Sequence, residues 1–181
     1  MSSPTADVSC RVAWADDAPA IARLQLRTRK HDLADLLPAE ELDTDPAVAE
    51  EAWRRLLTRP PDARVRVLVA LERNRVAGFA ITSPATDPDA DHVADAELME
   101  LTVDPEDRGR GHGSRLLQAA MDTIAADRFR RAVCWVVASD DAVRRFLTEA
   151  GWGPDGAHRE LDLDGTGAVT AKQIRLHTQF V

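Results

Sequence analysis

The residues best suited to chemistry form a glycine-rich run, RGRGHG, at residues 108–113. Glycine lacks a Cβ atom and adopts backbone angles closed to other residues, so such a run can turn several amide N–H groups toward one point. At the start of a helix these amides add to the positive end of the helix dipole. Arg108, Arg110 and Arg115 would bring full positive charges beside them. The run therefore predicts an anion site, and a diphosphate is the expected ligand.

The segments on either side of this run strengthen the prediction. Residues 97–103 (ELMELTV) are typical of a strand, and residues 113–126 (GSRLLQAAMDTIAA) place apolar side chains on one face of a helix. A flexible connector would need neither the arginines nor an immediate helix start. A P-loop would need Gly-Lys-Ser/Thr, and a dinucleotide fingerprint from Gly109 would need glycine or alanine where Ser114 stands.

The other elements place this unit at the centre of a layered domain. Before it, the sequence predicts a strand at residues 10–14, a helix from Asp16 or Asp17 onward and a second helix at 44–59. A β-hairpin is predicted from residues 63–72 and 75–84. After it we expect a strand at residues 131–138, a helix at 140–151 and two closing strands at 158–163 and 173–181. This order predicts a single α/β (α+β layered) domain over residues 1–181. Its sheet is mixed and mostly antiparallel, with about seven strands, four helices and a central βαβ unit.

Composition restricts the class of protein. A chain of 181 residues is long enough to bury a core without disulfides or a structural metal. Its formal net charge of −8 argues against nucleic-acid and anionic-membrane partners, which favour basic surfaces. The sequence has no charged-then-apolar leader and no apolar stretch of bilayer length. Cys10 and Cys134 are far apart, and Cys134 lies in an apolar run typical of a buried thiol. We expect a cytoplasmic protein.

The glycine-rich run and its flanks resemble the signature of the Gcn5-related N-acetyltransferase (GNAT) superfamily. That signature is Arg/Gln-x-x-Gly-x-Gly/Ala between a strand that ends in a valine-like residue and a helix; here RGRGHG follows LTVDPED and precedes SRLL. The resemblance implies the GNAT fold and an acetyl-coenzyme A-dependent N-acetyltransferase. It implies that backbone groups of Leu101, Thr102 and Val103 hold the pantetheine arm. It also implies that amides along the run hold the pyrophosphate, from Arg108, Gly109, Arg110, Gly111, His112, Gly113 and Ser114. The ring of His112 is expected to point outward.

The resemblance continues in DDAVRRFLTEAGW, where Ala142, Phe146 and Gly151 match an alanine, a phenylalanine and a glycine of the family. Phe146 is thereby placed at the cofactor. Two positions depart from the family pattern. Ser139 stands where many members have asparagine, and Leu147 stands where a tyrosine often serves as general acid; the chain contains no tyrosine. The acid role must therefore pass to a water or to Ser139, or be dropped.

Acetyl transfer to an amine also needs a base, and two glutamates lie on the strand that should line the acetyl group. Glu97 and Glu100 are three residues apart, so in a regular strand they face opposite sides unless a bulge intervenes. We favour Glu97, because the family often carries an acid at that strand position, and rank Glu100 second. An ordinary solvated carboxylate is the alternative for either residue.

Two acidic clusters lack the ligand spacing of a metal site, so no metal is predicted. Glu160, Asp162 and Asp164 begin like a calcium loop, but Ala171 stands where a bidentate glutamate is needed. The intervening leucines predict the end of a strand entering a hairpin. The second cluster is predicted to be a solvated loop and comprises Asp87, Asp89, Asp91 and His92.

The acceptor is the least defined part of the prediction. The resemblance places the acceptor wall in the first two helices and their connection, and residues 27–45 and 87–97 are acid-rich enough to attract a cationic amine. We expect a small-molecule amine such as a polyamine, an amino sugar or an amino-acid derivative, with a protein N-terminus or lysine as the alternative. Because Ser139 and Leu147 depart from the family, a non-catalytic acetyl-coenzyme A sensor is a second reading. A nucleotide-binding protein of another type is a third. The family's frequent dimers make a homodimer the prior expectation.

Overall fold

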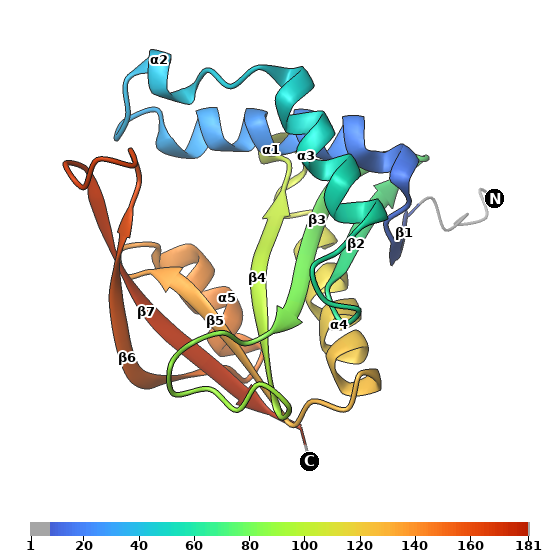
Figure 1. Cartoon of the computed structure of the whole chain (residues 1–181), viewed down its shortest axis with the longest axis vertical. Helices are drawn as coiled ribbons and strands as arrows, with labels where there is room; N and C mark the ends of the chain where they lie inside the picture. The colour runs from blue at the N-terminus through green and yellow to red at the C-terminus, as the bar shows by residue number, and fades with distance from the viewer. Residues whose placement is uncertain (1–7, 181) are drawn as a thin grey trace.

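The structure is a computed structural model that describes residues 8–180. One seven-stranded sheet runs through it in the order β1-β2-β3-β4-β5-β7-β6 (Figure 1). Neighbouring strands are antiparallel except β4 and β5, which are parallel. The strands are β1 (Val8–Val12), β2 (Arg66–Glu72), β3 (Arg75–Pro84), β4 (Asp95–Val103), β5 (Arg131–Val137), β6 (Gly153–Asp162) and β7 (Thr170–Gln179). The predicted mixed, mostly antiparallel sheet is confirmed.

Four main helices pack on this sheet. They are α1 (Ala18–Leu33), α3 (Pro46–Thr58), α4 (His112–Ala126) and α5 (Asp141–Glu149). One helical turn, α2 (Ala39–Leu42), and two short 3-10 turns, η1 (Ala15–Asp17) and η2 (Pro105–Asp107), were not predicted. Strand β6 begins five residues earlier than expected, and the last residue of the closing strand, Val181, lies outside the described residues.

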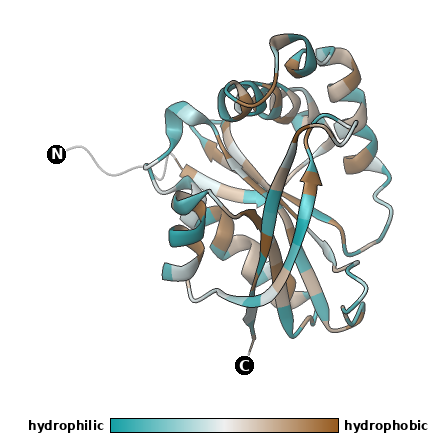
Figure 2. Ribbon diagram, turned by 90° about the vertical axis from the view of Figure 1, so that its left-hand side faces the viewer, coloured by the Kyte–Doolittle hydropathy of each residue, from teal (hydrophilic) through white to brown (hydrophobic). Residues whose placement is uncertain are grey.

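Each face of the sheet buries its own apolar cluster. Helices α1 and α3 cover one face, where their apolar side chains pack on alternate residues of β2 and β3, including Val67, Val69, Leu71, Phe79 and Ile81. Helix α4 covers the other face together with Leu147 of α5, packing on Leu68, Ala70, Ala80, Ala96 and Leu98. The period of two along the strands sorts neighbouring residues onto the two faces. Figure 2 shows hydrophobic residues along the central strands and hydrophilic residues on outer turns of the helices.

The parallel strands β4 and β5 pair over a short distance only. Their register joins Asp95 to Arg131, Ala96 to Ala132 and Glu97 to Val133. Beyond this point β4 continues to Val103 along β3, whereas β5 continues along β7. Figure 1 shows the two strands separating toward the end of the molecule where α1 lies. On the side that faces away from β3, the last residues of β4 therefore have no neighbouring strand to pair with.

A β-bulge interrupts β4 between the two candidate bases. Thr82 of β3 pairs with Leu98 and Ile81 pairs with Glu100, so Met99 has no partner and its side chain is 55% exposed. An extra residue reverses the alternation of the residues that follow it. Glu97 pairs with Ser83, which shares a face with Ile81, so Glu97 and Glu100 face the same side of the sheet. The strand is thus not regular here, and the exception stated for a bulge applies.

The predicted solvated loop between β3 and β4 is exposed at Asp89, Asp91 and His92, but Asp87 is held against the sheet. Asp87 accepts a 3.1 Å hydrogen bond from Trp135 Nε1 and another of 3.1 Å from Arg175 Nη1, and its side chain is only 12% exposed. Asp89 is also paired with Arg175, which holds its pKa at about 2. The sequence did not reveal this pairing, because the arginine that binds Asp87 and Asp89 comes from β7, almost ninety residues later.

We expect Gly78→Ala to destabilise the fold by about 1–3 kcal/mol, the usual cost of overpacking a filled core. A Cβ atom at Gly78 would lie 2.7 Å from the carbonyl oxygen of Thr102 and 3.0 Å from Leu116 Cδ1. Relieving that clash would separate β3 from β4 or lift α4. Urea unfolding measures the effect, with Gly153→Ala as the control because a methyl group there meets no atom within 4 Å. Equal stabilities for the two variants would contradict this account of the packing.

Candidate active site

The glycine-rich run forms a sharp turn into α4. Gly109 and Gly111 have φ angles of +76° and +84°, and Gly111 is the N-cap of the helix that begins at His112. Residues with a Cβ atom rarely adopt such angles, which explains glycine at these two positions. Amides in the first turn of a helix have no partner within the helix. The turn therefore presents backbone donors at the positive end of α4, as an anion site requires.

A cleft of about 960 Å³ lies at this turn, lined by residues of β4, α1 and α5 as well as the turn itself. Nine residues assigned to the cofactor by resemblance line it: Leu101, Thr102, Val103, Arg108, Gly109, Gly111, Gly113, Ser114 and Phe146. Six further lining residues were not assigned to the cofactor from the sequence: Thr28, His31 and Asp32, which lie in the predicted acceptor wall, and Asp140, Ala142 and Val143. Three of these six come from α1, where a polar stripe at helical spacing was the available signal.

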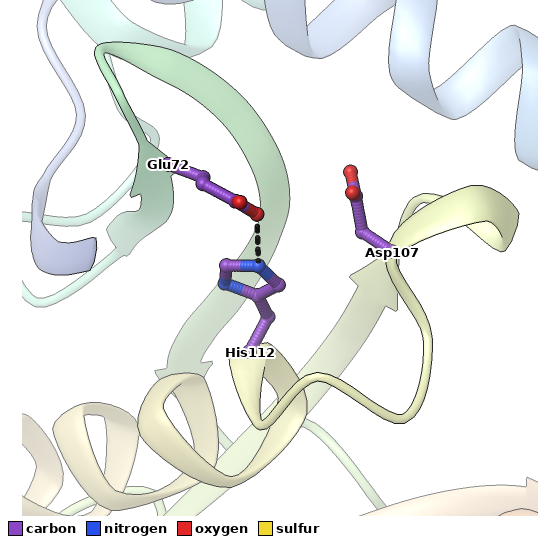
Figure 3. A group of neighbouring side chains, drawn as sticks. All are labelled: Glu72, Asp107 and His112. Atoms are coloured by element: carbon purple, nitrogen blue, oxygen red, sulfur yellow. Dashed lines mark hydrogen bonds and ion pairs between the residues drawn. The ribbon is translucent and has the colours of Figure 1, made fainter. Parts of the chain in front are cut away.

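Two members of the run, Arg110 and His112, turn away from the cleft. The ring of His112 is 1% exposed, so the expectation that it points outward is wrong, and its Nε2 lies 3.0 Å from Glu72 Oε2 (Figure 3). Arg110 donates to Glu72 at 2.6 Å and to Asp107 at 2.8 Å. Arg75 adds two bonds to Asp107, at 2.7 and 2.9 Å. These contacts fasten the back of the turn to the ends of β2 and β3.

Glu72, Asp107 and His112 are close enough together to be compared with a metal site. Each of the four carboxylate oxygens already lies within hydrogen-bond distance of an arginine or histidine nitrogen. The Arg75 guanidinium holds the pKa of Asp107 below its usual range. Because guanidinium groups already fill the positions that a cation would take, we interpret this group as a structural anchor for the turn.

A second cavity of about 580 Å³ adjoins the cleft. It lies between α1, α3 and the end of β4, and it shares Thr28, Asp32 and Thr102 with the cleft. Its other lining residues include Gln25, Arg29, Leu33, Thr44, Val48, Ala52 and Glu100. The predicted acceptor wall, residues 27–45, contributes several of these side chains, whereas none of residues 87–97 lines either cavity.

Glu100 is the carboxylate of β4 that reaches this second cavity. Its Oε1 accepts a 3.0 Å hydrogen bond from Thr102, and its Oε2 accepts a 3.4 Å bond from Gln25. Trp53 orients Gln25 by donating to its amide oxygen at 2.9 Å. Burial raises the pKa of Glu100, with the two hydrogen bonds acting in the opposite sense. A partly buried carboxylate with a raised pKa suits proton transfer near neutral pH.

Glu97, the glutamate favoured on sequence grounds, occupies a different environment. It lines neither cavity. Its surroundings are Asp87, Cys134 and the guanidinium groups of Arg159 and Arg175. Its pKa is also raised, by burial first and by the charge of Asp87 second. A raised pKa therefore does not separate the two glutamates, but their positions do.

The two family departures lie away from the cleft wall. Ser139 is exposed and lines neither cavity, while its neighbour Asp140 caps α5 by accepting from the Val143 amide at 3.0 Å. Leu147 is 2% exposed and packs in the core beneath α4. The α5 side chain that faces the cleft is Phe146.

Comparisons with known proteins identify the family of the chain. The model of the acetyltransferase (GNAT) family matches residues 27–152. An N-acetyltransferase of Streptomyces griseus is 31% identical over 124 residues, which are 66% of this chain and 63% of that protein. A phosphinothricin N-acetyltransferase of Streptomyces coelicolor is 29% identical over 157 residues, covering 79% and 90% of the two chains.

Solved structures share the fold. The YncA protein of Salmonella typhimurium, determined with its cofactor acetyl-CoA, has a TM-score of 0.72 and 18% identity, covering 96% of this chain and 94% of its own. Among the helices of residues 8–180, none combines the length and apolar character needed to cross a bilayer. The family match spans the cleft-lining strand, the glycine-rich turn and α5. The chain therefore belongs to the GNAT family, and it is an acyltransferase of the N-acetyltransferase type.

Proposed function

We propose that this enzyme transfers the acetyl group of acetyl-coenzyme A to a primary amine of a small molecule. The observation that carries the proposal is the pair of adjoining cavities, which share a wall and differ in chemistry. The cleft offers backbone amides and Arg108, as a diphosphate needs, and the second cavity offers Glu100, as an amine needs.

The cleft fits the cofactor in shape and in chemistry. Its volume of about 960 Å³ is at the upper end of ordinary ligand sites. Leu101, Thr102 and Val103 lie where β4 has left β5, so their backbone groups are suited to an extended arm. The amides of His112, Gly113 and Ser114 begin α4 and are suited to the pyrophosphate. Bound acetyl-coenzyme A would supply a thioester whose C–S bond breaks as the C–N bond forms.

Glu100 is proposed as the general base in place of Glu97. Amines reach the enzyme mainly as ammonium ions, because their usual pKa is near 10. A carboxylate in the acceptor cavity can accept the proton that must leave before nitrogen attacks. Thr102 and Gln25 hold that carboxylate in one orientation, which lowers the cost of arranging it during the reaction.

Ser139→Ala is expected to leave kcat and KM within about twofold of the wild-type values. The serine lies outside both cavities, and a coenzyme A thiolate, with a conjugate acid pKa near 8.5, can leave without a side-chain acid. Steady-state thiol release measures the effect. A loss of tenfold or more in kcat would return Ser139 to the list of proton donors.

A panel of amines assayed by thiol release tests the proposed function. We expect turnover with one or more small amines, such as an amino acid, an amino sugar or 1,4-diaminobutane. The Streptomyces coelicolor relative, named for phosphinothricin, supports a small acceptor. A peptide panel with free N-termini and lysines is the comparison, because faster transfer to peptides would favour a protein acceptor. Acetyl-coenzyme A binding without turnover on either panel would favour the sensor reading.

Two further expectations remain part of this proposal. A cytoplasmic location is supported by the two cysteines, neither of which is in a disulfide. Burial raises the pKa of the Cys134 thiol to about 12, so this cysteine is a poor nucleophile. The expectation of a homodimer comes only from the frequent dimers of the family, and light scattering tests it.

A further inference from the structure

One ion pair connects the acceptor wall to the glycine-rich turn. Arg108 Nη1 and Nη2 donate to the two carboxylate oxygens of Asp32, at 3.0 and 2.8 Å, and Arg108 Nε donates to the Val103 carbonyl at 3.3 Å. Asp32 belongs to the last turn of α1, whereas Arg108 opens the turn into α4. Both residues line the cleft, so the pair joins two parts of its wall that are 76 residues apart in sequence.

Arg108 is the only arginine among the described residues that line the cleft. Arg110 is paired with Glu72 and Asp107 behind the turn, and Arg115, which donates to the carbonyl of Arg110 at 3.4 Å, does not line the cleft. The side chain best placed to meet a diphosphate is thus already neutralised by Asp32. A diphosphate entering the cleft must compete with that carboxylate for the guanidinium.

The competition favours the diphosphate. The side chains of Arg108 and Asp32 are 44% and 41% exposed, and ion pairs this open to water contribute little stability. A diphosphate brings more than one negative charge, matches the planar fork of a guanidinium, and gains the α4 amides at the same time. A carboxylate left beside it would be repelled.

Among residues 8–180, Asp32 is also the only charged residue that lines both cavities. Once released, its carboxylate can turn by side-chain rotation toward the second cavity, where Glu100 is the other acid. His31 Nδ1, 2.8 Å from Asp32 Oδ1, stays beside it on the same helix. Arg29 is the cation of the cavity wall, one turn from Asp32. The released carboxylate would make the cavity more negative.

We propose that Asp32 couples the two substrates: the cofactor diphosphate takes Arg108 from Asp32, and the freed carboxylate then attracts the ammonium group of the acceptor. This inference rests on the proposed function for the identity of the two ligands. Asp32 acts as a positioning residue, since it binds the incoming amine but does not take its proton. Reciprocity requires that the acceptor strengthen cofactor binding by the same factor.

Titration calorimetry with coenzyme A tests the first half. Asp32→Asn should bind coenzyme A about three- to tenfold more tightly than the wild type, because Arg108 is no longer occupied. Asp35→Asn is the matched control, since it removes the same charge three residues later and Asp35 lines neither cavity. Damage to the fold would weaken binding, so a tighter complex has no structural explanation. Affinity equal to that of Asp35→Asn, or weaker, would overturn the proposal.

The second half is tested by titrating an amine with and without saturating coenzyme A. The probe is the best acceptor of the amine panel, or 1,4-diaminobutane if none is turned over. Wild-type enzyme and Asp32→Glu should bind the amine at least about fivefold more tightly when coenzyme A is present. For Asp32→Asn, the ratio of the amine affinities with and without coenzyme A should be near one. Equal ratios in wild type and Asp32→Asn would overturn the coupling. Failure of the whole panel would instead count against the proposed function.

Discussion

Replacing Glu100 by glutamine is expected to lower kcat/KM for the amine by about 100-fold or more, the usual contribution of a positioned general base. Glutamine keeps the size of the side chain and can still receive the hydrogen bond from Thr102 through its amide oxygen. It cannot accept the ammonium proton. Steady-state thiol release with the best acceptor of the panel measures the effect, and coenzyme A affinity should stay within about threefold of the wild-type value.

Glu97→Gln is the matched control for this experiment. The two glutamates are on the same strand, face the same side of the sheet and both have raised pKa values. Only Glu100 lines the acceptor cavity. We therefore expect Glu97→Gln to lose less than about threefold in kcat/KM. The opposite result, with a large loss for Glu97→Gln and little for Glu100→Gln, would restore Glu97 as the base.

The pH profile gives the same test a second measurement. A base works in its deprotonated form, so activity falls as pH drops through its pKa. Because burial raises the pKa of Glu100, the acidic limb of kcat/KM should lie above the range of an ordinary glutamate. That limb should disappear in Glu100→Gln and persist in Glu97→Gln. An acidic limb unchanged in Glu100→Gln would show that another group titrates.

The choice between these glutamates marks the limit of what the sequence could predict. The strand itself was visible in the apolar pattern of residues 97–103. The bulge at Met99 depends on how β4 pairs with β3, and neither residue type nor spacing encodes that register. A single unpaired residue brought both acids to one face, and the distance of each from the two cavities then depended on α1, α3 and β7.

The glycine-rich turn was more predictable because its constraints are local. Positive φ angles at Gly109 and Gly111 and an immediate helix start follow from neighbouring residues alone. The directions of the charged side chains in the same run were not predictable. Arg110 and His112 turn away from the cleft because Glu72, about forty residues earlier, accepts from both. Local sequence thus specified the backbone of the site, and distant partners decided which side chains face the ligand.

The departure at Leu147 looked like a loss of catalytic function when judged by residue type. Its side chain is part of the core, and Phe146 forms the cleft wall beside it. Helix α5 therefore offers the cleft an apolar side chain at the place where a tyrosine would be sought. We expect this arrangement to be sufficient, because a thiolate can leave without a side-chain acid.

Gly113→Leu is expected to weaken coenzyme A binding by about 100-fold, or about 2.7 kcal/mol, while leaving the fold intact. Gly113 differs from Gly109 and Gly111, because its backbone is helical and its φ angle does not require glycine. A Cβ atom there would lie 3.7 Å from Phe146 and 3.8 Å from Val103, which is ordinary van der Waals contact across the cleft. The rest of a leucine side chain must then extend into the volume proposed for the pantetheine arm.

Gly113→Ala and Ala125→Leu separate this steric effect from effects on the helix. The alanine variant adds only a methyl group in ordinary contact, and alanine favours helix over glycine, so stability should hold or rise while affinity falls only a few-fold. Ala125→Leu places a leucine on the exposed face of α4, and residue 125 lines neither cavity. This variant should bind coenzyme A as the wild type does. Calorimetry gives the affinities and thermal unfolding confirms the fold. Unimpaired binding by a folded Gly113→Leu enzyme would mean that the arm does not pass between Val103 and Phe146, and the assignment of the cleft to the cofactor would fail.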